Sequence, residues 1–215
     1  MTRRRRDVHL DYDVDAEPLG HAAMGCSVRK VVHKKTRTAY AMKTFSFKTK
    51  AESKCVQDVQ CAVMVVLKHT SFLSVYCANR AEQKKMLEYL RNEIQLLRNL
   101  DHPNIIRPVQ TYEWAGELHL IMELCGKDLT SRTYTEDQAR QIVRQVASAI
   151  NYCHDKRVCH RDLKMENILF ENDDPDCMTV KLIDFGISRT FHSGDPMTER
   201  VGTVYIMAPE VLLGH

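Results

Sequence analysis

The spacing of the apolar residues changes along this chain of 215 residues, and that change restricts the folds it can adopt. Residues 18–44 are punctuated by glycine and then rich in Val, Thr and Tyr, which is typical of paired β-strands. Residues 84–100 instead carry apolar side chains at helical spacing, among them Leu90 and Ile94, until Pro103 ends the run. The sequence therefore predicts a β-hairpin followed by an amphipathic helix.

Two more strands and a second helix are expected further along. Residues 105–109 and 117–124 have the composition of strands. Thr135 and Gln138 form a capping-box signature ahead of a second apolar helical repeat, which should end near Tyr152. Because strands come first and helices later, we expect an α+β fold with a β-rich part packed on an α-helical part, and functional residues in the cleft between them.

The composition is that of a globular chain without a dominant charge. Lys and Arg number 31 against 28 Asp and Glu, and the surplus of +3 includes the run Arg3–Arg6, so no nucleic-acid partner is indicated. No apolar export signal follows these arginines, and polar residues interrupt the apolar stretch 61–78. We therefore expect a cytoplasmic protein without a membrane span. Arg3–Arg6 should form a solvated basic tail, with a signal for nuclear entry as the alternative.

Residues 47–83 interrupt the pattern, because their apolar stretches match neither the helical nor the strand period. Long structureless loops are uncommon inside compact domains. We interpret this segment as an insertion. It is either a disordered loop, translated non-coding sequence or a docking loop.

Five short motifs occur in an informative order along the chain. They are Gly20-His-Ala-Ala-Met-Gly25, Tyr40-Ala-Met-Lys43, His160-Arg-Asp-Leu-Lys-Met-Glu-Asn167, Asp184-Phe-Gly186 and Ala208-Pro-Glu210. In this order they resemble the signature set of the protein kinases. The resemblance implies a two-lobed kinase-like fold, with a basic tail at 1–11, a β-rich N-lobe with one long helix at 12–122 and a partial α-helical C-lobe at 123–215.

The resemblance gives each motif a part in moving the γ-phosphoryl group of ATP to a protein hydroxyl, a reaction that depends on positioning and electrostatics. Lys43 is expected to hold the α- and β-phosphates and to be oriented by Glu93, although a helix glutamate is more often a solvated surface residue. Asp162 is the expected catalytic base. Asn167 and Asp184 are expected to bind Mg²⁺ through oxygen, as a hard cation prefers.

The resemblance also implies the lining of the nucleotide site. Lys164, two residues after Asp162, matches the serine/threonine kinases and should neutralise charge on the transferred group. A mostly apolar pocket with a few fixed polar groups suits a planar base. The residues expected there are Gly20 and Gly25 of the glycine loop, Val28, Ala41 and Leu169 around the base, Met122 as gatekeeper, and the hinge backbone of Glu123 and Cys125. His160, Phe185 and Leu97 should stack within the core.

Within the kinases, the likeness is greatest to the calcium/calmodulin-dependent and calcium-dependent protein kinases, on residues 100–105, 160–169 and 197–203. The calcium-dependent enzymes join their kinase domain to EF-hands, but this chain contains no D-x-D-x-D-G loop. We therefore expect protein substrates that carry serine or threonine, and no calcium control from within this chain.

Three acidic residues outside the catalytic set carry further expectations. Glu199 lies in the segment where many kinases carry an activating phosphothreonine, so its carboxylate can pair permanently with Arg161. The alternative is an exposed glutamate beside Arg200. Asp128 and Glu166 are expected to favour a basic residue upstream of the target serine or threonine.

The chain departs from the kinase pattern at four places. Ala22 replaces the middle glycine of the glycine loop, the insertion separates Lys43 from Glu93, and residues 126–134 are shorter than the family's linker and helix. The sequence ends at His215, before the later helices of the α lobe, so we expect exposed apolar surface. The alternative function is therefore a catalytically impaired, truncated kinase-like module that binds a nucleotide or a partner.

Overall fold

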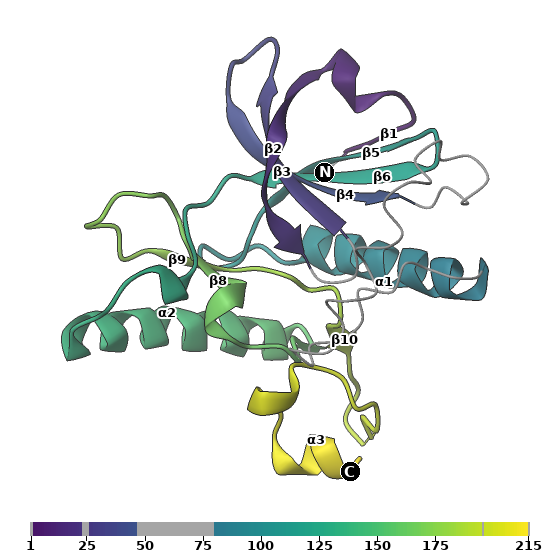
Figure 1. Cartoon of the computed structure of the whole chain (residues 1–215). Helices are drawn as coiled ribbons and strands as arrows, with labels where there is room; N and C mark the ends of the chain where they lie inside the picture. Colours follow the sequence, from purple (N-terminus) through teal and green to yellow (C-terminus); the bar gives the residue numbers. More distant parts are fainter. Residues whose placement is uncertain (1, 23–25, 47–79, 195, 215) are drawn as a thin grey trace, which may run out of the picture.

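The computed structural model describes residues 2–22, 26–46, 80–194 and 196–214. Six strands form one sheet in the order β1-β5-β6-β4-β3-β2 (Figure 1). Their bounds are Thr2–Arg4 (β1), Tyr12–Ala22 (β2), Cys26–His33 (β3), Ala39–Ser46 (β4), Pro108–Trp114 (β5) and Glu117–Glu123 (β6). Neighbouring strands are antiparallel, except that β1 runs parallel to β5. The predicted hairpin and the strand predicted at 117–124 are confirmed.

One long helix, α1 (Arg80–Asn99), lies against the sheet (Figure 1). Leu90 of this helix is buried in the same cluster as Phe45 of β4, which explains why the apolar residues recur at helical spacing. The predicted amphipathic helix is confirmed, but it starts earlier than expected. Residues 80–83, which we assign to the insertion, belong to α1, and residues 47–79 lie outside the described part of the chain.

The α-helical part is built on α2 (Glu136–Asp155) and the hairpin of β8 (Ile168–Phe170) and β9 (Val180–Leu182). Thr135 and Gln138 cap α2 reciprocally, which confirms the predicted capping box. The remaining elements are Leu129–Ser131 (η3), Val158–Cys159 (β7), Met165–Asn167 (η4), Arg189–Thr190 (β10), Val204–Ile206 (η5) and Pro209–Leu213 (α3). None of the helices in the described ranges is long and apolar enough to cross a membrane.

Residues 2–11 fold onto the sheet and do not form the free tail expected at 1–11, although the side chains of Arg3–Arg5 are exposed as expected. Strand β1 pairs with β5, and the short helix η1 (Val8–Leu10) buries Val8 in a second small core. Asp11 accepts a hydrogen bond from the hydroxyl of Tyr112, which lies on β5. The physical reason is that an open sheet edge presents unpaired backbone groups, which a short segment can satisfy whatever its side chains.

Strand β5 begins at Pro108, whereas the sequence predicts a strand over 105–109. The apolar residues Ile105 and Ile106 are buried, and they meet the α-helical part instead of extending the sheet. Ile105 forms a single parallel bridge with Leu182 of β9, and Ile106 N donates to Leu182 O at 2.9 Å. This segment therefore joins the two parts of the molecule.

Candidate active site

Strand β4 and helix α1 bring Lys43 and Glu93 together. Lys43 Nζ lies 2.9 Å and 3.0 Å from the two carboxylate oxygens of Glu93. The same ammonium donates to Asp184 Oδ1 at 3.0 Å, from the α-helical part. Lys43 and Glu93 are only 5% and 2% exposed, so Glu93 is not the solvated helix carboxylate that was the alternative. A buried ammonium thus links one carboxylate from each part of the molecule.

The two carboxylates respond differently to this shared ammonium. Burial raises the pKa of Glu93, and the attraction of Lys43 does not reverse the effect. Burial also acts against ionisation of Asp184, but the charge and hydrogen bond of Lys43, together with smaller contributions from His160 and the backbone of Gly186, hold the pKa of Asp184 below its usual value. Asp184 is therefore held in its ionised form.

A second cluster fixes the carboxylate of Asp162. Its Oδ1 accepts hydrogen bonds from Thr203 N at 3.0 Å and Thr203 Oγ1 at 2.6 Å. Its Oδ2 accepts from Asn167 Nδ2 at 2.9 Å and lies 3.1 Å from Lys164 Nζ. Lys164 Nζ also donates to Thr203 Oγ1 at 2.9 Å. Because both oxygens are held from different elements, the carboxylate keeps one orientation.

Backbone strain accompanies these two clusters. Arg161 and Asp184 adopt left-handed conformations with φ of 69° and 61°, which cost about 1–3 kcal/mol each in residues other than glycine and concentrate at functional sites. Gly202 has φ of 124°, and a Cβ there would lie 2.7 Å from the carbonyl oxygen of Arg161. The chain next to Thr203 therefore requires glycine.

A cavity of about 730 Å³ lies beside these residues, between the sheet and the α-helical part. The residues predicted for catalysis, nucleotide binding and the metal that line it are Val28, Ala41, Lys43, Glu93, Met122, Glu123, Cys125, Lys164, Asn167, Leu169 and Asp184. Leu19, Ile106 and Ile183 also line it and were not predicted. Gly20 lies on β2 opposite Val28, and Gly25 falls outside the described residues. Burial raises the pKa of the Cys125 thiol to about 12, so it stays protonated.

His160 and Phe185, the sequence neighbours of Arg161 and Asp184, are buried and pack against each other. Their ring centroids are 4.8 Å apart with an edge-on geometry, and Phe185 belongs to the same core as Leu97. His160 Nε2 lies 2.9 Å from Ile183 O. Burial lowers the pKa of His160, so the ring is neutral at physiological pH and acts as a packing group.

The oxygen donors of the site fit Mg²⁺. Among the described residues, no three His, Cys, Asp or Glu side chains gather as a metal cluster. Asn167 and Asp184 line the same cavity and offer an amide and a carboxylate oxygen. Mg²⁺ is commonly bound by one or two carboxylates plus water and substrate phosphates, so a sparse oxygen donor set suits it. A structural zinc site would need four protein ligands.

Comparison with known proteins decides the family. The sequence model described as "Protein kinase domain" matches residues 64–215. The chain belongs to the protein kinase family. It is 32% identical over 210 residues to calcium-dependent protein kinase 3 of Plasmodium yoelii yoelii. The aligned residues make up 94% of this chain and 32% of that protein.

Other relatives lie in the same group of kinases. Calcium-dependent protein kinase 8 of Oryza sativa subsp. japonica is 42% identical over 136 residues, or 60% of this chain and 25% of the relative. Calcium/calmodulin-dependent protein kinase type 1 of Caenorhabditis briggsae is 41% identical over 145 residues, or 65% of this chain and 40% of the relative. The chain spans about a third of the length of the first of these relatives. The α+β fold described above is that of a kinase N-lobe with a partial C-lobe.

The activation segment of this kinase domain is tied to the residue before Asp162. Arg161 donates to the Glu199 carboxylate, and Arg189 lies 2.9 Å from the same carboxylate, so the predicted Arg161–Glu199 contact is present. The hydrogen bond from Arg161 lowers the pKa of Glu199, which is half exposed. Glu199 is therefore exposed, as in the alternative, but its carboxylate is paired with Arg161 and Arg189.

Thr203 is the functional candidate that sequence reasoning missed. Its backbone and hydroxyl both hold Asp162, and its side chain is bridged to Lys164. The sequence signal for Thr203 is the Gly202-Thr203 pair ahead of Ala208-Pro-Glu210. The contacts of Thr203 with Asp162 join residues 41 positions apart, so no local pattern reveals them.

Proposed function

We propose that this chain uses ATP and Mg²⁺ to phosphorylate serine or threonine side chains of protein substrates. The observation that carries the proposal is the meeting of Lys43, Glu93 and Asp184 at the wall of one cavity, next to Asn167, which is bonded to Asp162. We place the N-lobe boundary at residue 122 and the hinge at Glu123, and we extend the N-lobe to include β1.

Phosphate binding is assigned to the buried ammonium. Lys43 would contact the α- and β-phosphates, and Glu93 would keep it aimed at the cavity. Asn167 and Asp184 would hold Mg²⁺, which supplies positive charge to the phosphates. The protein contributes fixed charges in a partly water-excluded site, where electrostatic interactions are stronger than in water.

Proton transfer is assigned to Asp162. Thr203, Asn167 and Lys164 hold both of its oxygens in one orientation. A substrate hydroxyl would displace one of these donors when the carboxylate orients it and accepts its proton. Lys164 would balance the charge that remains on the transferred group. Within the proposal, Lys164 at this position matches the serine/threonine kinases, and its side chain also contacts Thr203.

A basic residue upstream of the target is favoured by the acidic rim of the cavity. Glu166 accepts a hydrogen bond from Tyr205 at 3.0 Å, and Asp128 caps η3 by accepting from Thr130 N at 2.8 Å. Both carboxylates line the cavity, so they would attract a cationic side chain of a substrate. A peptide array should show a preference for upstream arginine that weakens in Glu166→Gln, and equal preferences in both proteins would contradict this assignment.

The test of the main proposal compares the wild-type chain with Asp162→Asn. We expect Mg-ATP to stabilise both proteins in a thermal-shift experiment, because Asp162 does not line the nucleotide cavity. Transfer of labelled phosphate to a basic serine or threonine peptide should occur only with the wild type, and the matched tyrosine peptide should remain unlabelled. Stabilisation of the wild type without transfer would refute the proposed activity and favour a nucleotide-binding module. A kinase also needs a compartment that supplies ATP, so we propose an intracellular location.

A further inference from the structure

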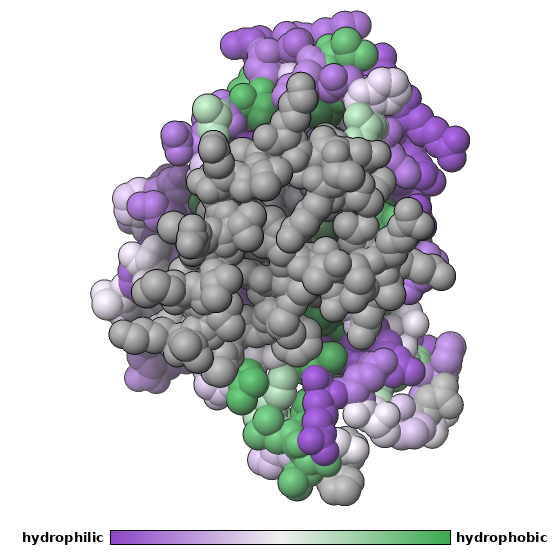
Figure 2. All heavy atoms as spheres, turned by 45° about the vertical axis from the view of Figure 1, so that its right-hand side comes forward, coloured by the Kyte–Doolittle hydropathy of each residue, from purple (hydrophilic) through white to green (hydrophobic). Residues whose placement is uncertain are grey.

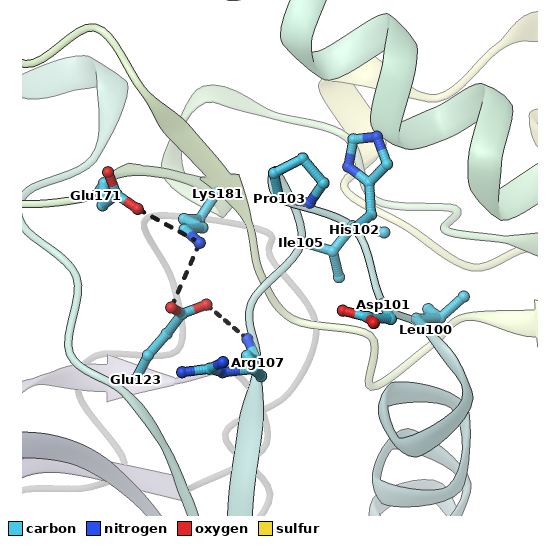
Figure 3. Close-up of a pocket in the computed structure, with 9 residues that line it drawn as sticks. All are labelled: Leu100, Asp101, His102, Pro103, Ile105, Arg107, Glu123, Glu171 and Lys181. Carbon is cyan, nitrogen blue, oxygen red and sulfur yellow. Dashed lines mark hydrogen bonds and ion pairs between the residues drawn. The ribbon is translucent and has the colours of Figure 1, made fainter.

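A second cavity, of about 300 Å³, lies behind the proposed hinge (Figure 3). Glu123 lines both this cavity and the nucleotide cavity. In Figure 3 its carboxylate lies between Lys181 on one side and the backbone of Arg107 on the other. The carboxylate of the hinge residue is thus held by Lys181 and Arg107, neither of which takes part in the proposed chemistry.

These contacts close into a ring. Glu123 N donates to Arg107 O at 3.1 Å, and Arg107 N donates back to Glu123 Oε1 at 2.7 Å. The residue before Arg107 is Ile106, whose N–H donates to Leu182 O at 2.9 Å on β9. Lys181, the neighbour of Leu182, closes the ring through its Nζ, which lies 3.3 Å from Glu123 Oε2. The ring contains the last residue of β6, the segment before β5 and the strand that leads to Asp184.

The contact between Lys181 and Glu123 is an ion pair whose ammonium is buried. Lys181 is 8% exposed, and removing an ammonium from water costs free energy that its carboxylate partners only partly return. Its other partner, Glu171, lies at 3.6 Å and is half exposed. The adjoining cavity means that apolar packing does not fill the space behind the hinge. The ion pair therefore contributes more to the geometry of the hinge than to overall stability.

We propose that Lys181 is a positioning residue for nucleotide binding. It holds the Glu123 carboxylate behind the hinge and so fixes the backbone of residues 123–125 along the nucleotide cavity. The inference rests on the proposed function, because it assumes that the 730 Å³ cavity receives ATP. Lys181 does not line this cavity, and its side chain is linked to the cavity through the carboxylate of Glu123.

The test measures Mg-ADP binding by calorimetry and steady-state phosphate transfer in the full chain. Lys181→Met should weaken Mg-ADP binding at least about fivefold, the low end of typical couplings between sites. The Michaelis constant for ATP should rise by the same factor while kcat changes less than about twofold, because the loss is in ground-state binding. Lys181→Arg should restore binding, since its guanidinium keeps the charge. The matched control is Glu171→Gln, which removes only the ion pair between Lys181 and the half-exposed Glu171. It should change Mg-ADP binding less than about twofold.

A second variant keeps the proposal testable if Lys181→Met does not fold. Glu123→Gln retains an oxygen for Arg107 N but removes the charge that pairs with Lys181, so it should weaken binding as Lys181→Met does. Combining the two substitutions should add nothing, because both break the same contact. Unchanged Mg-ADP binding in folded Lys181→Met or Glu123→Gln would overturn the inference while leaving the proposed function intact. If the wild type itself does not bind Mg-ADP, the proposed function fails and this inference fails with it.

Discussion

The hydroxyl of Tyr112 binds the N-terminal segment to the sheet. Removing this hydroxyl tests whether the packing of residues 2–11 on the sheet stabilises the fold. Tyr112 is fully buried on β5, and its hydroxyl lies 2.6 Å from Asp11 Oδ2 and 2.9 Å from Gln110 Oε1. Burial and the nearby Asp11 raise the pKa of Tyr112 above its usual range, so the hydroxyl remains a donor at neutral pH. Tyr112→Phe removes this donor and leaves the ring against Tyr12, at a centroid distance of 5.9 Å.

The expected loss of stability in Tyr112→Phe follows from the charge of Asp11, the carboxylate that accepts the hydrogen bond from Tyr112. A hydrogen bond to a charged group contributes about 1.5–3 kcal/mol to folding. Asp11 keeps Arg4 and Arg6 as partners after the substitution, so its charge is not left alone. We therefore expect the free energy of unfolding to fall by about 2 kcal/mol. For a chain of this size, that corresponds to a decrease in Tm of about 4–8 °C.

The same contact makes the effect depend on pH. Burial acts to raise the pKa of Asp11, but the hydrogen bonds from Tyr112 and Arg6 and the charges of Arg6 and Arg4 hold it below the usual value. A depressed carboxyl pKa gives stability that is present above the unfolded pKa of about 3.9 and is lost as the pH falls through the folded pKa. The difference between wild type and Tyr112→Phe should therefore shrink below about pH 4.

The assay is urea unfolding followed by far-UV circular dichroism at neutral pH and at acidic pH. Tyr205→Phe is the matched control, because Tyr205 is 68% exposed and its loss should change stability by less than about 0.5 kcal/mol. A Tyr112→Phe protein as stable as the wild type, or a loss that is the same at both pH values, would refute this account of the N-terminal segment.

Three further substitutions test the catalytic assignments. Glu93→Gln keeps the shape but removes the charge beside Lys43, so kcat should fall about 100-fold through misplacement of the ammonium, and unchanged kcat would contradict the assignment. Gly202→Ala places a Cβ 2.7 Å from Arg161 O at a φ of 124°, so urea unfolding should show a loss of about 1–3 kcal/mol together with lower phosphate transfer. Glu199→Gln should lower transfer no more than about fivefold, because a half-exposed ion pair contributes about 0–1 kcal/mol. Since the pKa of Glu199 is lowered in the folded state, the wild type should lose this advantage as the pH falls through that pKa, so equal pH profiles would count against the contact.

The sequence predicts best those features that depend on neighbouring residues. The capping box at Thr135 places the start of α2 correctly, because both of its hydrogen bonds join residues three positions apart. Lys43, Asp162 and Lys164 are predicted for the same reason, since each belongs to a short motif, whereas Glu93 is predicted from its place on the apolar-periodic helix. Once Lys43 is placed on β4 and Glu93 on the buried side of α1, their contact follows from the fold.

The features that sequence reasoning missed depend on pairing between distant segments. Strand β1 pairs with β5, more than 100 positions away, and nothing in a run of arginines specifies that register. The isoleucines at 105 and 106 have strand composition, yet they turn to β9, because burial in the core decides where apolar residues lie. The ring behind the hinge likewise joins Glu123 to Lys181 through side-chain atoms that follow no local pattern.

The C-terminal end of the molecule carries the apolar surface that we expect from the sequence. Figure 2 shows hydrophobic side chains gathered at the end that carries α3, and Val204, Tyr205, Leu212 and Leu213 there are between 45% and 68% exposed. Clustered exposed apolar side chains favour association, whereas a single one does not. We therefore predict that the chain self-associates as its concentration rises.

Sedimentation velocity over a concentration series measures this association, and a pair of lysine substitutions identifies the surface. Leu213 and Val143 are both 64% exposed, but Leu213 belongs to the C-terminal cluster and Val143 lies on α2. Burying a leucine side chain contributes about 1.5–3 kcal/mol, so Leu213→Lys should raise the dissociation constant of the associated form at least about tenfold. Val143→Lys adds the same charge at an equally exposed site, and it should leave the constant unchanged if the cluster drives association. Equal effects of the two substitutions would mean that net charge, and not this apolar surface, controls association of the chain.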